Sequence, residues 1–373
     1  MPTHRLQQAK RIVVKVGSNV LTARNDLNTN VIESISRQIC ILIDKGVEVL
    51  LVSSGAMAAG LRRMRLSARP DEIPQRQAIS AIGQSGLMYA YEEAFGGCDK
   101  KVAQILLTSE DLNNRERYLN ARNALYALLA WKVVPIINEN DTIKVEEIKL
   151  GDNDNLSAMI ALLMDADFLI NLTDIDGLYT KDPRTFDDAE LIPQVTAYNK
   201  QIETYAGDIP GALGSGGMLS KIRAAKKVTA AGVPMIIAKG TKPDILTRLF
   251  GGERHGTYFV PKEKKLPSRK CWIAYTLKPK GSIIVDDGAA RAVLQNGKSL
   301  LPSGIVDVRG HFGPGDAVEF MTGQGPALGI GLVNYNVSEI QAIKGLKTSQ
   351  IKSKLGSKPY DEVIHRDNLV ITG

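Results

Sequence analysis

The chain has 373 residues, of which 44% are hydrophobic, and its formal net charge is +7. This length suits two domains with a sizeable core, and no apolar run reaches the roughly 18–20 residues that a membrane span needs. The N-terminus lacks the apolar stretch of a secretory signal and the three cysteines (Cys40, Cys98 and Cys271) form no CxxC pair, so we expect a cytoplasmic protein with reduced thiols and no zinc site.

Residues 11–250 alternate between short apolar runs and longer amphipathic stretches. The apolar runs predict strands at Ile12–Val16, Val47–Ser53, Val102–Leu107, Val133–Ile137, Phe168–Leu172 and Pro234–Ala238. The amphipathic stretches predict helices at Thr29–Lys45, Pro74–Phe95, Arg115–Ala130, Leu156–Met164 and Leu219–Ala231. This alternation predicts a mainly parallel sheet between two layers of helices, a three-layer α/β/α sandwich. Because ligands bind beyond the carboxyl ends of such strands, the residues after each strand are the site candidates.

The first predicted strand ends in VVKVGSN, residues 13–19, where Lys15 is a lone cation in an apolar run and Gly17 follows it. A glycine lets backbone amides face a ligand, and a lysine supplies a mobile charge for a phosphate. The alternative is a lysine on an edge strand whose side chain reaches back to solvent.

The second predicted strand runs into VSSGAMAAG, residues 52–60. Ser54 and its neighbours could cap the next helix and expose its first amides, which would suit a carboxylate ligand. Helix capping without any ligand explains the same residues.

Acidic and amide residues crowd after the fourth predicted strand, first in INEND (residues 137–141) and then in GDNDNLSAM (residues 151–159). One such residue would suffice to cap the following helix, so four in a row exceed that need. Their carboxylates could hold a substrate ammonium group or orient active-site lysines.

The last two motifs follow the fifth strand and open the last predicted helix. LTDIDGLYTKDPR, residues 172–184, puts Thr173 and Asp174 at a strand's carboxyl end, where a nucleotide would lie. GSGGMLSK, residues 214–221, frees a run of amides and puts Lys221 one turn into a helix. This arrangement suits a phosphate cradle, although it is neither a Walker A nor a Rossmann motif. The alternative is a flexible linker of the same composition.

The chemistry of these motifs favours phosphoryl transfer, which needs mainly positioning and charge neutralisation. None of the four histidines falls in a motif. A carboxylate acceptor, with a pKa of about 4.3, is already ionised at pH 7 and needs no general base. The motifs therefore fit phosphorylation of a carboxylate better than that of a hydroxyl.

The character of the chain changes after Lys262. Short β-rich runs at Ser282–Val285, Gly304–Val308, Ala317–Met321 and Ala327–Val333 are punctuated by Gly and Pro. We expect an α/β domain at 1–262, a basic linker at 263–275, a β-rich domain at 276–356 and a tail at 357–373. Residues 261–373 hold sixteen Lys and Arg against ten Asp and Glu, so they carry most of the net positive charge. A basic run is usually a solvated face, and binding of a polyanion is the alternative.

Together VVKVGSN, SSGAMAAG, LTDIDGLYTKDPR and GSGGMLSK resemble the amino acid kinase superfamily. INEND with GDNDNLSA is narrower and is similar to the glutamate 5-kinases, while residues 284–305 resemble a PUA domain. The resemblance covers nearly the whole chain. It implies ATP-dependent phosphorylation of the L-glutamate side chain to glutamyl 5-phosphate plus ADP, the first step of proline biosynthesis, with feedback inhibition by proline. It also implies Mg²⁺ on the ATP phosphates and a homo-oligomer, a dimer or a tetramer.

The same resemblance implies roles for individual residues. Lys15 and Lys221 would neutralise the transferring phosphoryl group, and Asp154 would orient both lysines. The residues implied for glutamate are Ser54, Asp141 and Asn153, with Asn138 and Asp152 as further candidates. The residues implied for ATP are Lys15, Gly17, Thr173, Asp174, Ser215, Gly216, Gly217, Met218, Leu219, Ser220 and Lys221. Leu219 departs from the Ser or Thr expected there, which removes one hydroxyl contact to phosphate.

Two competing functions stay open at this point. One is a kinase of the same superfamily that acts on aspartate, acetylglutamate or a nucleotide, against which the β-rich tail argues. The other is an RNA-binding protein on a kinase scaffold, acting through the basic PUA domain. Since the tail shows no stripe of aromatic residues for base stacking, we expect it to modulate the kinase or its assembly instead. No membrane partner is expected.

Overall fold

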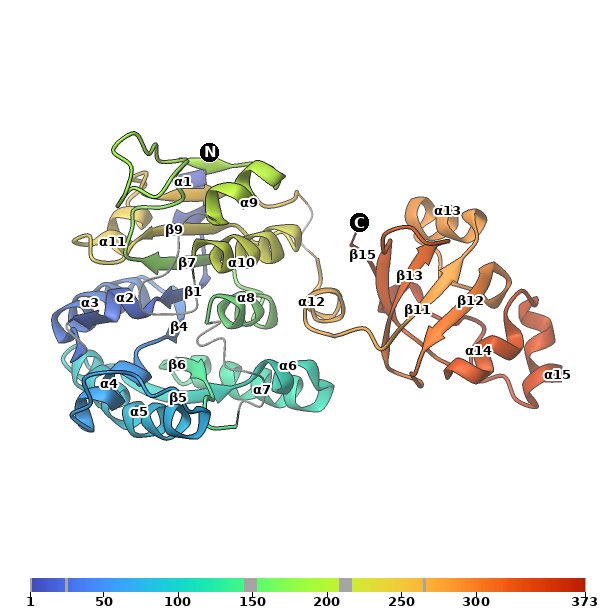
Figure 1. The fold of residues 1–373 in the computed structure, drawn as a ribbon, viewed down its shortest axis with the longest axis horizontal. Coiled ribbons are helices and arrows are strands. Elements are labelled where there is room, and N and C mark those ends of the chain that lie inside the picture. The colour runs from blue at the N-terminus through green and yellow to red at the C-terminus, as the bar shows by residue number, and fades with distance from the viewer. Residues whose placement is uncertain (1, 24–25, 144–152, 208–216, 264–265, 373) are drawn as a thin grey trace. The chain divides into compact units, whose positions relative to one another are not determined.

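The computed structural model describes residues 2–23, 26–143, 153–207, 217–263 and 266–372. The chain divides into two compact units, Met1–Lys265 and Leu266–Gly373, and Figure 1 shows the elements of each. Within the described ranges, no helix combines the length and the apolar character needed to cross a membrane.

The first unit is built on an eight-stranded sheet in the order β5-β6-β4-β1-β7-β9-β10-β8. Neighbouring strands are parallel except β10, which runs antiparallel to β9. The strands are β1 (Arg11–Val16), β4 (Glu48–Ser53), β5 (Lys101–Leu107), β6 (Val133–Glu139), β7 (Phe168–Thr173), β8 (Gln194–Val195), β9 (Met235–Lys239) and β10 (Thr257–Phe259). The predicted mainly parallel sheet is confirmed, and the short strands β8 and β10 extend it.

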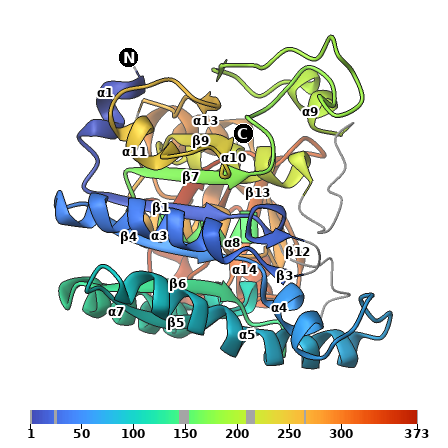
Figure 2. The same cartoon turned by 90° about the vertical axis from the view of Figure 1, so that its left-hand side faces the viewer.

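Helices lie on both faces of this sheet, which confirms the predicted sandwich. One face is covered by α3, α5 and α11, and the other by α7, α8 and α10, as Figures 1 and 2 show. The helices are α1 (Pro2–Gln7), α2 (Ser18–Leu21), α3 (Thr29–Asp44), α4 (Ala56–Arg63), α5 (Ile73–Gly96), α6 (Ser109–Asn113), α7 (Arg115–Ala130), α8 (Asn153–Leu163), α9 (Lys200–Gly207), α10 (Met218–Ala230) and α11 (Ile245–Phe250). A small hairpin, β2 (Thr22–Ala23) with β3 (Asp26–Leu27), follows α2.

Strand β1 divides its side chains between the two layers because successive residues point to opposite faces. Ile12, Val14 and Val16 belong to the core that includes α3 and α5. Lys15 points to the other layer, where α8 lies, and it is 4% exposed. Since β1 lies between β4 and β7, Lys15 is not on an edge strand, and the interpretation of a solvent-reaching lysine is wrong.

Helices α4 and α5 pack with their backbones in contact. A Cβ atom on Gly83 would lie 1.7 Å from the carbonyl oxygen of Ala56, and one on Gly60 would lie 2.0 Å from that of Ile79. Gly55, which precedes α4, has φ +102°, a conformation that favours glycine. These glycines therefore fix where α4 begins, two residues after Ser54.

The second unit contains a five-stranded sheet in the order β12-β11-β13-β14-β15, which confirms the predicted β-rich domain. Its elements are α12 (Ser268–Tyr275), β11 (Gly281–Val285), α13 (Asp287–Asn296), β12 (Ile305–Gly310), β13 (Ala317–Thr322), β14 (Gly329–Leu332), α14 (Val337–Ile343), α15 (Ile351–Leu355) and β15 (Leu369–Ile371). Strands β11 and β13 are parallel, and the other pairs are antiparallel.

The organisation of this unit differs from the expected ranges at both ends. Residues 268–275, expected in the linker, form α12, which buries Cys271, Trp272 and Ile273 within a run of basic residues. In the expected tail, Leu369 and Val370 are buried because β15 pairs with β14. Apolar residues inside polar stretches thus join both segments to the core.

Candidate active site

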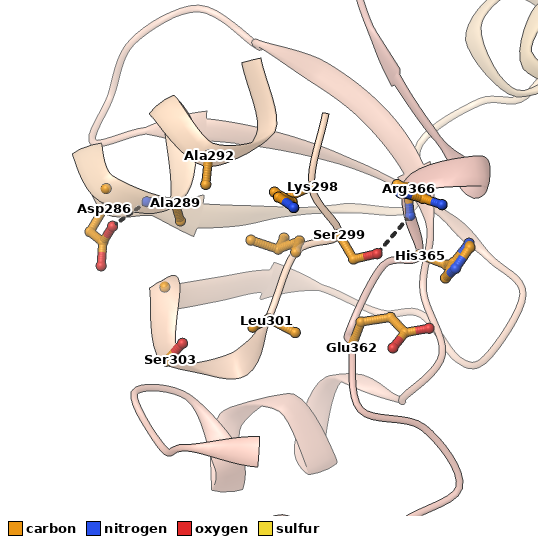
Figure 3. A pocket seen from close by; sticks show the side chains of 13 residues that line it. Asp286, Ala289, Ala292, Lys298, Ser299, Leu301, Ser303, Glu362, His365 and Arg366 are labelled. Carbon is orange, nitrogen blue, oxygen red and sulfur yellow. Dashed lines mark hydrogen bonds between the residues drawn. The ribbon is translucent and has the colours of Figure 1, made fainter. Parts of the chain in front are cut away.

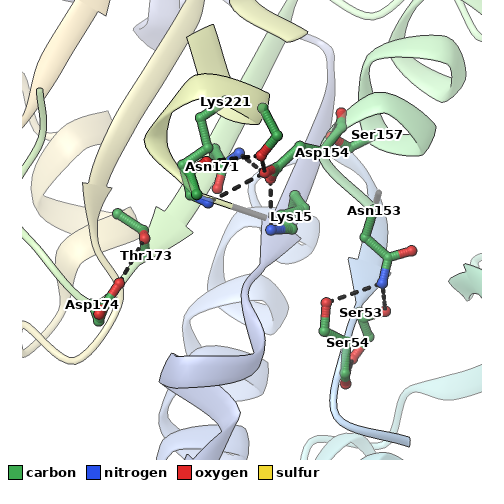
Figure 4. Close-up of polar contacts among 12 residues, drawn as sticks. Lys15, Ser53, Ser54, Asn153, Asp154, Ser157, Asn171, Thr173, Asp174 and Lys221 are labelled. Atoms are coloured by element: carbon green, nitrogen blue, oxygen red, sulfur yellow. Dashed lines mark hydrogen bonds and ion pairs between the residues drawn. The ribbon is translucent and has the colours of Figure 1, made fainter. Parts of the chain in front are cut away.

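Asp154 is the centre of a buried ionic cluster on the α8 side of the sheet. Its carboxylate lies 2.6 Å from the ammonium of Lys15, at the end of β1, and 3.2 Å from that of Lys221, on α10. It also accepts hydrogen bonds from Asn171 Nδ2 (2.8 Å) and Ser220 Oγ (2.5 Å). Figure 4 shows the lysines converging on this carboxylate from two sides. The structure therefore brings together the three residues implied for catalysis.

The electrostatics of the cluster follow from its burial and its charges. Burial alone would raise the pKa of Asp154, but the charges of Lys15 and Lys221 and the hydrogen bonds from Lys15 and Ser220 outweigh it and hold that pKa far below its usual range. The carboxylate is therefore ionised at neutral pH. Two ammonium groups against one carboxylate leave a positive charge among the three residues, which suits an incoming phosphate.

Asn153, the residue before Asp154, points into a different set of polar groups. Its Nδ2 lies 3.0 Å from each of Ser54 Oγ, Asn138 Oδ1 and the carbonyl oxygen of Ser53. Its Oδ1 is buried and has no hydrogen-bond partner among the described residues. A buried amide oxygen without a partner is costly, so this atom is available to a ligand donor such as an ammonium group.

The first turn of α8 therefore joins two groups of predicted site residues. The side chain of Asp154 faces the lysines, while that of Asn153 faces Ser54 and Asn138. Because the two residues are consecutive on one helix, the distance between the two groups is set by the backbone. Such an arrangement can hold a phosphate donor beside a small polar acceptor.

The start of α10 supplies backbone amides next to the lysines. Gly217 is the N-cap, and it provides no side-chain cap for the first amides of this 13-residue helix. Met218 is buried, Leu219 is half-buried, and the hydroxyl of Ser220 is bonded to Asp154. Unfilled amides at a helix N-terminus attract anions, so this turn can bind a phosphate.

The ends of β7 and β1 add further groups at the same edge of the sheet. Thr173 Oγ1 donates to Asp174 Oδ1 at 3.0 Å, and Asn19 Nδ2 donates to Asp174 Oδ2 at 3.2 Å. The amide of Gly17 donates to the carbonyl oxygen of Leu172 at 3.0 Å. The loops after these two strands are therefore tied together, close to Lys15.

Asp141 lies two residues beyond the end of β6 and is half-buried. Its carboxylate is close enough to the guanidinium of Arg69 to favour the charged form of that group. Three other predicted site residues, Asp152, Ser215 and Gly216, lie outside the described residues.

Three residues of the site were missed by the sequence analysis. Asn171 lies in β7 directly beside Lys15 of β1, and its Oδ1 is buried without a hydrogen-bond partner in the described ranges. Asn19 bonds to Asp174, and Tyr91 bonds to the hydroxyl of Ser53 at 2.8 Å. The only signal for Asn171 in the sequence is an amide inside an otherwise apolar strand.

The described residues offer no cluster of three or more His, Cys, Asp or Glu side chains that could hold a metal ion. The carboxylate of Asp154 is engaged by lysines, and that of Asp174 accepts two hydrogen bonds. Magnesium commonly binds through substrate phosphates and water with few protein ligands. The residues present therefore fit an ion that is held mainly by a nucleotide.

A separate cavity of about 700 Å³ lies in the second unit, between the start of α13 and the segments around residues 300 and 365. Figure 3 shows Lys298, His365 and Arg366 on its wall together with the carboxylates of Asp286 and Glu362. Since both signs of charge line it, the cavity is not the continuous basic surface that binding to a phosphate backbone uses.

Comparisons with known proteins match both units. The model of the amino acid kinase family matches residues 10–239, and that of the PUA domain matches residues 281–355. The chain is 50% identical over 362 residues to a glutamate 5-kinase of Caldanaerobacter subterraneus subsp. tengcongensis, covering 97% of each chain. It is 50% identical over 367 residues to a glutamate 5-kinase of Geobacter sulfurreducens, covering 98% of each. A solved carbamate kinase from Giardia lamblia is 19% identical, with a TM-score of 0.49 over 69% of this chain and 100% of that one.

Proposed function

The chain belongs to the amino acid kinase family and, within it, to the glutamate 5-kinases, and we propose that it transfers the γ-phosphoryl group of ATP to the side-chain carboxylate of L-glutamate. The products are glutamyl 5-phosphate and ADP, and the reaction is the first step of proline biosynthesis. The observation that carries this proposal is Asp154 held between Lys15 and Lys221, next to the polar group around Asn153.

The acceptor needs no general base from the protein. A glutamate side chain has a pKa of about 4.3, so its carboxylate is ionised at neutral pH. One of its oxygens forms a bond to the γ-phosphorus while the bond from that phosphorus to the β-phosphate oxygen breaks, and ADP leaves with the electron pair. The ionic cluster contains no histidine, in keeping with this chemistry.

The protein contributes mainly positive charge and positioning. Lys15 and Lys221 neutralise charge on the transferring phosphoryl group, and Asp154 keeps both ammonium groups aimed at it. Groups that are fixed before the reaction stabilise a transition state without a cost of reorganisation. Asn171 and Ser220 in turn orient the carboxylate of Asp154.

Glutamate would bind where Asn153 meets Ser54 and Asn138. The free Oδ1 of Asn153 can accept a hydrogen bond from the substrate ammonium group, and Asp141 supplies a negative charge for the same group. Because Asn153 precedes Asp154, a glutamate held there has its side-chain carboxylate near the two lysines.

ATP would bind across the ends of β1 and β7 and the start of α10. The amides of Gly217, Met218 and Leu219 would hold phosphate oxygens, while Gly17, Thr173 and Asp174 lie at the strand ends where a nucleotide fits. Magnesium would arrive on the phosphates of ATP, where it supplies further positive charge. Proline as feedback inhibitor, a homo-oligomer and action in the cytoplasm complete the proposal, and they rest on the relationship to the family.

Turnover of ATP with different acceptors tests this proposal. We would assay the protein with Mg²⁺ and glutamate, aspartate, acetylglutamate or a nucleoside monophosphate, and add hydroxylamine to trap acyl phosphates. Hydroxamate formed with glutamate and suppressed by proline is the expected result. Hydroxamate formed only with another acid would overturn the substrate, and no turnover at all would overturn the reaction.

A further inference from the structure

Glutamate carries two charged groups besides the carboxylate that reacts. Its α-ammonium group has a partner in the proposed site, because Asp141 and Asn153 offer it oxygen atoms. Its α-carboxylate needs donors of its own, and Ser54, Asn138 and Asn153 include no cation. A site that distinguishes α-amino acids from other acids recognises both groups.

Two arginines near the start of α5 have unused donors. Arg69 lies in the segment between α4 and α5, and Arg76 lies in the first turn of α5. The Nε atom of each is shielded from solvent and has no hydrogen-bond partner among the described residues. A buried N–H group left without an acceptor costs about 1–3 kcal/mol. Arginines that keep such donors unused are therefore suited to an anion that arrives from solution.

The charges of Arg76 and Asp141 both act on Arg69. Burial lowers the pKa of Arg69 and the charge of Arg76 lowers it further, while the charge of Asp141 opposes both effects. Arg69 therefore lies within electrostatic reach of both residues. Arg76 is held in place because its Nη2 donates to the carbonyl oxygen of Asp71 at 2.8 Å. Because the two guanidinium groups repel each other, a negatively charged ligand beside them would be favoured.

The spacing of these groups matches the chemistry of an α-amino acid. Its ammonium and its carboxylate are bonded to the same carbon, so a protein that binds both must place an acid beside a base. Asp141 and Arg69 offer such a pair, because the charge of Asp141 acts on the guanidinium of Arg69. A guanidinium also fits a carboxylate with two parallel hydrogen bonds, which a lysine does not provide.

We propose that Arg69 binds the α-carboxylate of the substrate glutamate, with Arg76 adding positive charge beside it, while Asp141 binds the α-ammonium group. This inference rests on the proposed function and adds the determinant that selects an α-amino acid. The close packing of α4 on α5 through Gly60 and Gly83 holds the two helices that flank Arg69.

The test compares L-glutamate with L-isoglutamine, in which a neutral amide replaces the α-carboxylate and the side-chain carboxylate is kept. In the Arg69→Gln variant we expect kcat/KM for glutamate to fall about 10–100-fold, mainly through KM, because a hydrogen-bonded charge pair is lost. The value for isoglutamine should change less than about 3-fold. Arg69→Lys should recover part of the loss, since it keeps the charge without the planar fork.

The matched control is Arg63→Gln on α4, whose guanidinium is exposed and bonds to Ser85 at 2.6 Å. This variant should behave as the wild type with both substrates. Calorimetric titration of each variant with the two compounds gives the same comparison when isoglutamine is not turned over. Unfolding temperatures identify variants that have lost their fold, and Arg76→Gln then serves as the second variant.

Each outcome decides one question. Equal losses for glutamate and isoglutamine in Arg69→Gln, or no loss for either, would overturn this inference and leave the proposed function standing. Absence of hydroxamate from the wild type with glutamate would overturn the proposed function itself. A selective loss for glutamate that Arg69→Lys partly restores supports the assignment.

Discussion

The ammonium of Lys15 and the carboxylate of Asp154 lie 2.6 Å apart, with both side chains almost fully buried. The pair links the central strand β1 to the first turn of α8. A buried ion pair is stabilising only when its remaining hydrogen-bonding capacity is satisfied, and here Asn171, Ser220 and Lys221 satisfy it on the side of Asp154. The same contacts that hold the helix on the sheet therefore aim the lysines.

Replacing Asp154 by Asn should impair both stability and activity. Two buried ammonium groups lose their negative partner, which costs about 3–5 kcal/mol of unfolding free energy. Turnover should fall at least about 100-fold because the lysines are no longer held toward the phosphate. Chemical denaturation and the hydroxamate assay measure the two effects. Asp188→Asn, at an exposed ion pair with Lys181, is the control and should change neither the unfolding free energy nor the turnover. An Asp154→Asn variant that is fully active and fully stable would contradict the central role of the cluster.

The stability that Asp154 provides should depend on pH in a defined direction. Its pKa in the folded protein lies well below the ordinary value of 3.8, so as the pH falls the unfolded chain takes up a proton on this group first. The contribution is therefore complete above roughly pH 5 and is lost progressively below about pH 4. The difference in unfolding free energy between the wild type and Asp154→Asn should narrow over that range. Denaturant titrations from pH 3 to pH 7 measure it, and a constant difference would argue against an ionised Asp154.

The sequence predicted the sheet well because its central strands are covered on both faces. The predicted run Phe168–Leu172 corresponds to β7, Phe168–Thr173, and the predicted helix Arg115–Ala130 is α7. The motifs at the strand ends were found for a related reason: polar residues after an apolar strand are unusual unless they have a local function.

The sequence analysis missed site residues whose position depends on contacts between segments far apart in the chain. Asn171 becomes part of the site only because the register of β1 on β7 places it beside Lys15. That register cannot be predicted from the sequence of either strand alone. Arg69 lies in a segment between two helices and its sequence context is that of any solvated arginine; only the fold brings it within electrostatic reach of Asp141.

In the second unit the analysis overlooked a local signal. Only short β-rich runs were predicted there, yet Asp286 caps α13 by accepting a hydrogen bond from the amide of Ala289, and Gly297 ends the helix with φ +58°. An Asp before and a Gly after a short amphipathic stretch are ordinary helix limits. Neither α13 nor α14 was among the predicted elements.

Lys221→Met should reduce turnover far more than the affinity for ATP. The ammonium group acts mainly on charge that develops during transfer, while the amides at the start of α10 still hold the phosphates. Steady-state kinetics give kcat, and titration with ATP gives the affinity. Lys226→Met on the same helix, whose exposed ammonium lies 3.5 Å from Glu203, is the matched control. Equal losses in turnover and affinity would mean that Lys221 only binds ATP.

Asp141→Asn should raise the KM for glutamate at least about 10-fold and leave the KM for ATP almost unchanged, because it removes a charged hydrogen-bond acceptor from the ammonium group of the substrate. Initial rates measured with each substrate varied in turn separate the two constants. Asp44→Asn, at an ion pair with Lys100 on the surface, should change neither. An increase confined to the KM for ATP would mean that Asp141 contributes to nucleotide binding instead of glutamate binding.

Two glycines of α5 test whether backbone contact with α4 positions Ser54. In Gly83→Ala the new Cβ would lie 1.7 Å from the carbonyl oxygen of Ala56 and 2.6 Å from the amide of Gly60, and neither backbone atom can rotate away. Helix α4 must shift, which should cost at least about 1–3 kcal/mol of unfolding free energy and raise the KM for glutamate. The matched control is Gly86→Ala, in which the atom nearest to the new Cβ is the Cβ of Ala59 at 3.9 Å, an ordinary contact.

Since alanine favours a helix over glycine by up to about 1 kcal/mol, the Gly86→Ala variant should be as stable as the wild type or more so. Thermal unfolding of the pair measures the contrast, and shifts of the same sign and size would mean that the backbone contact does not fix α4.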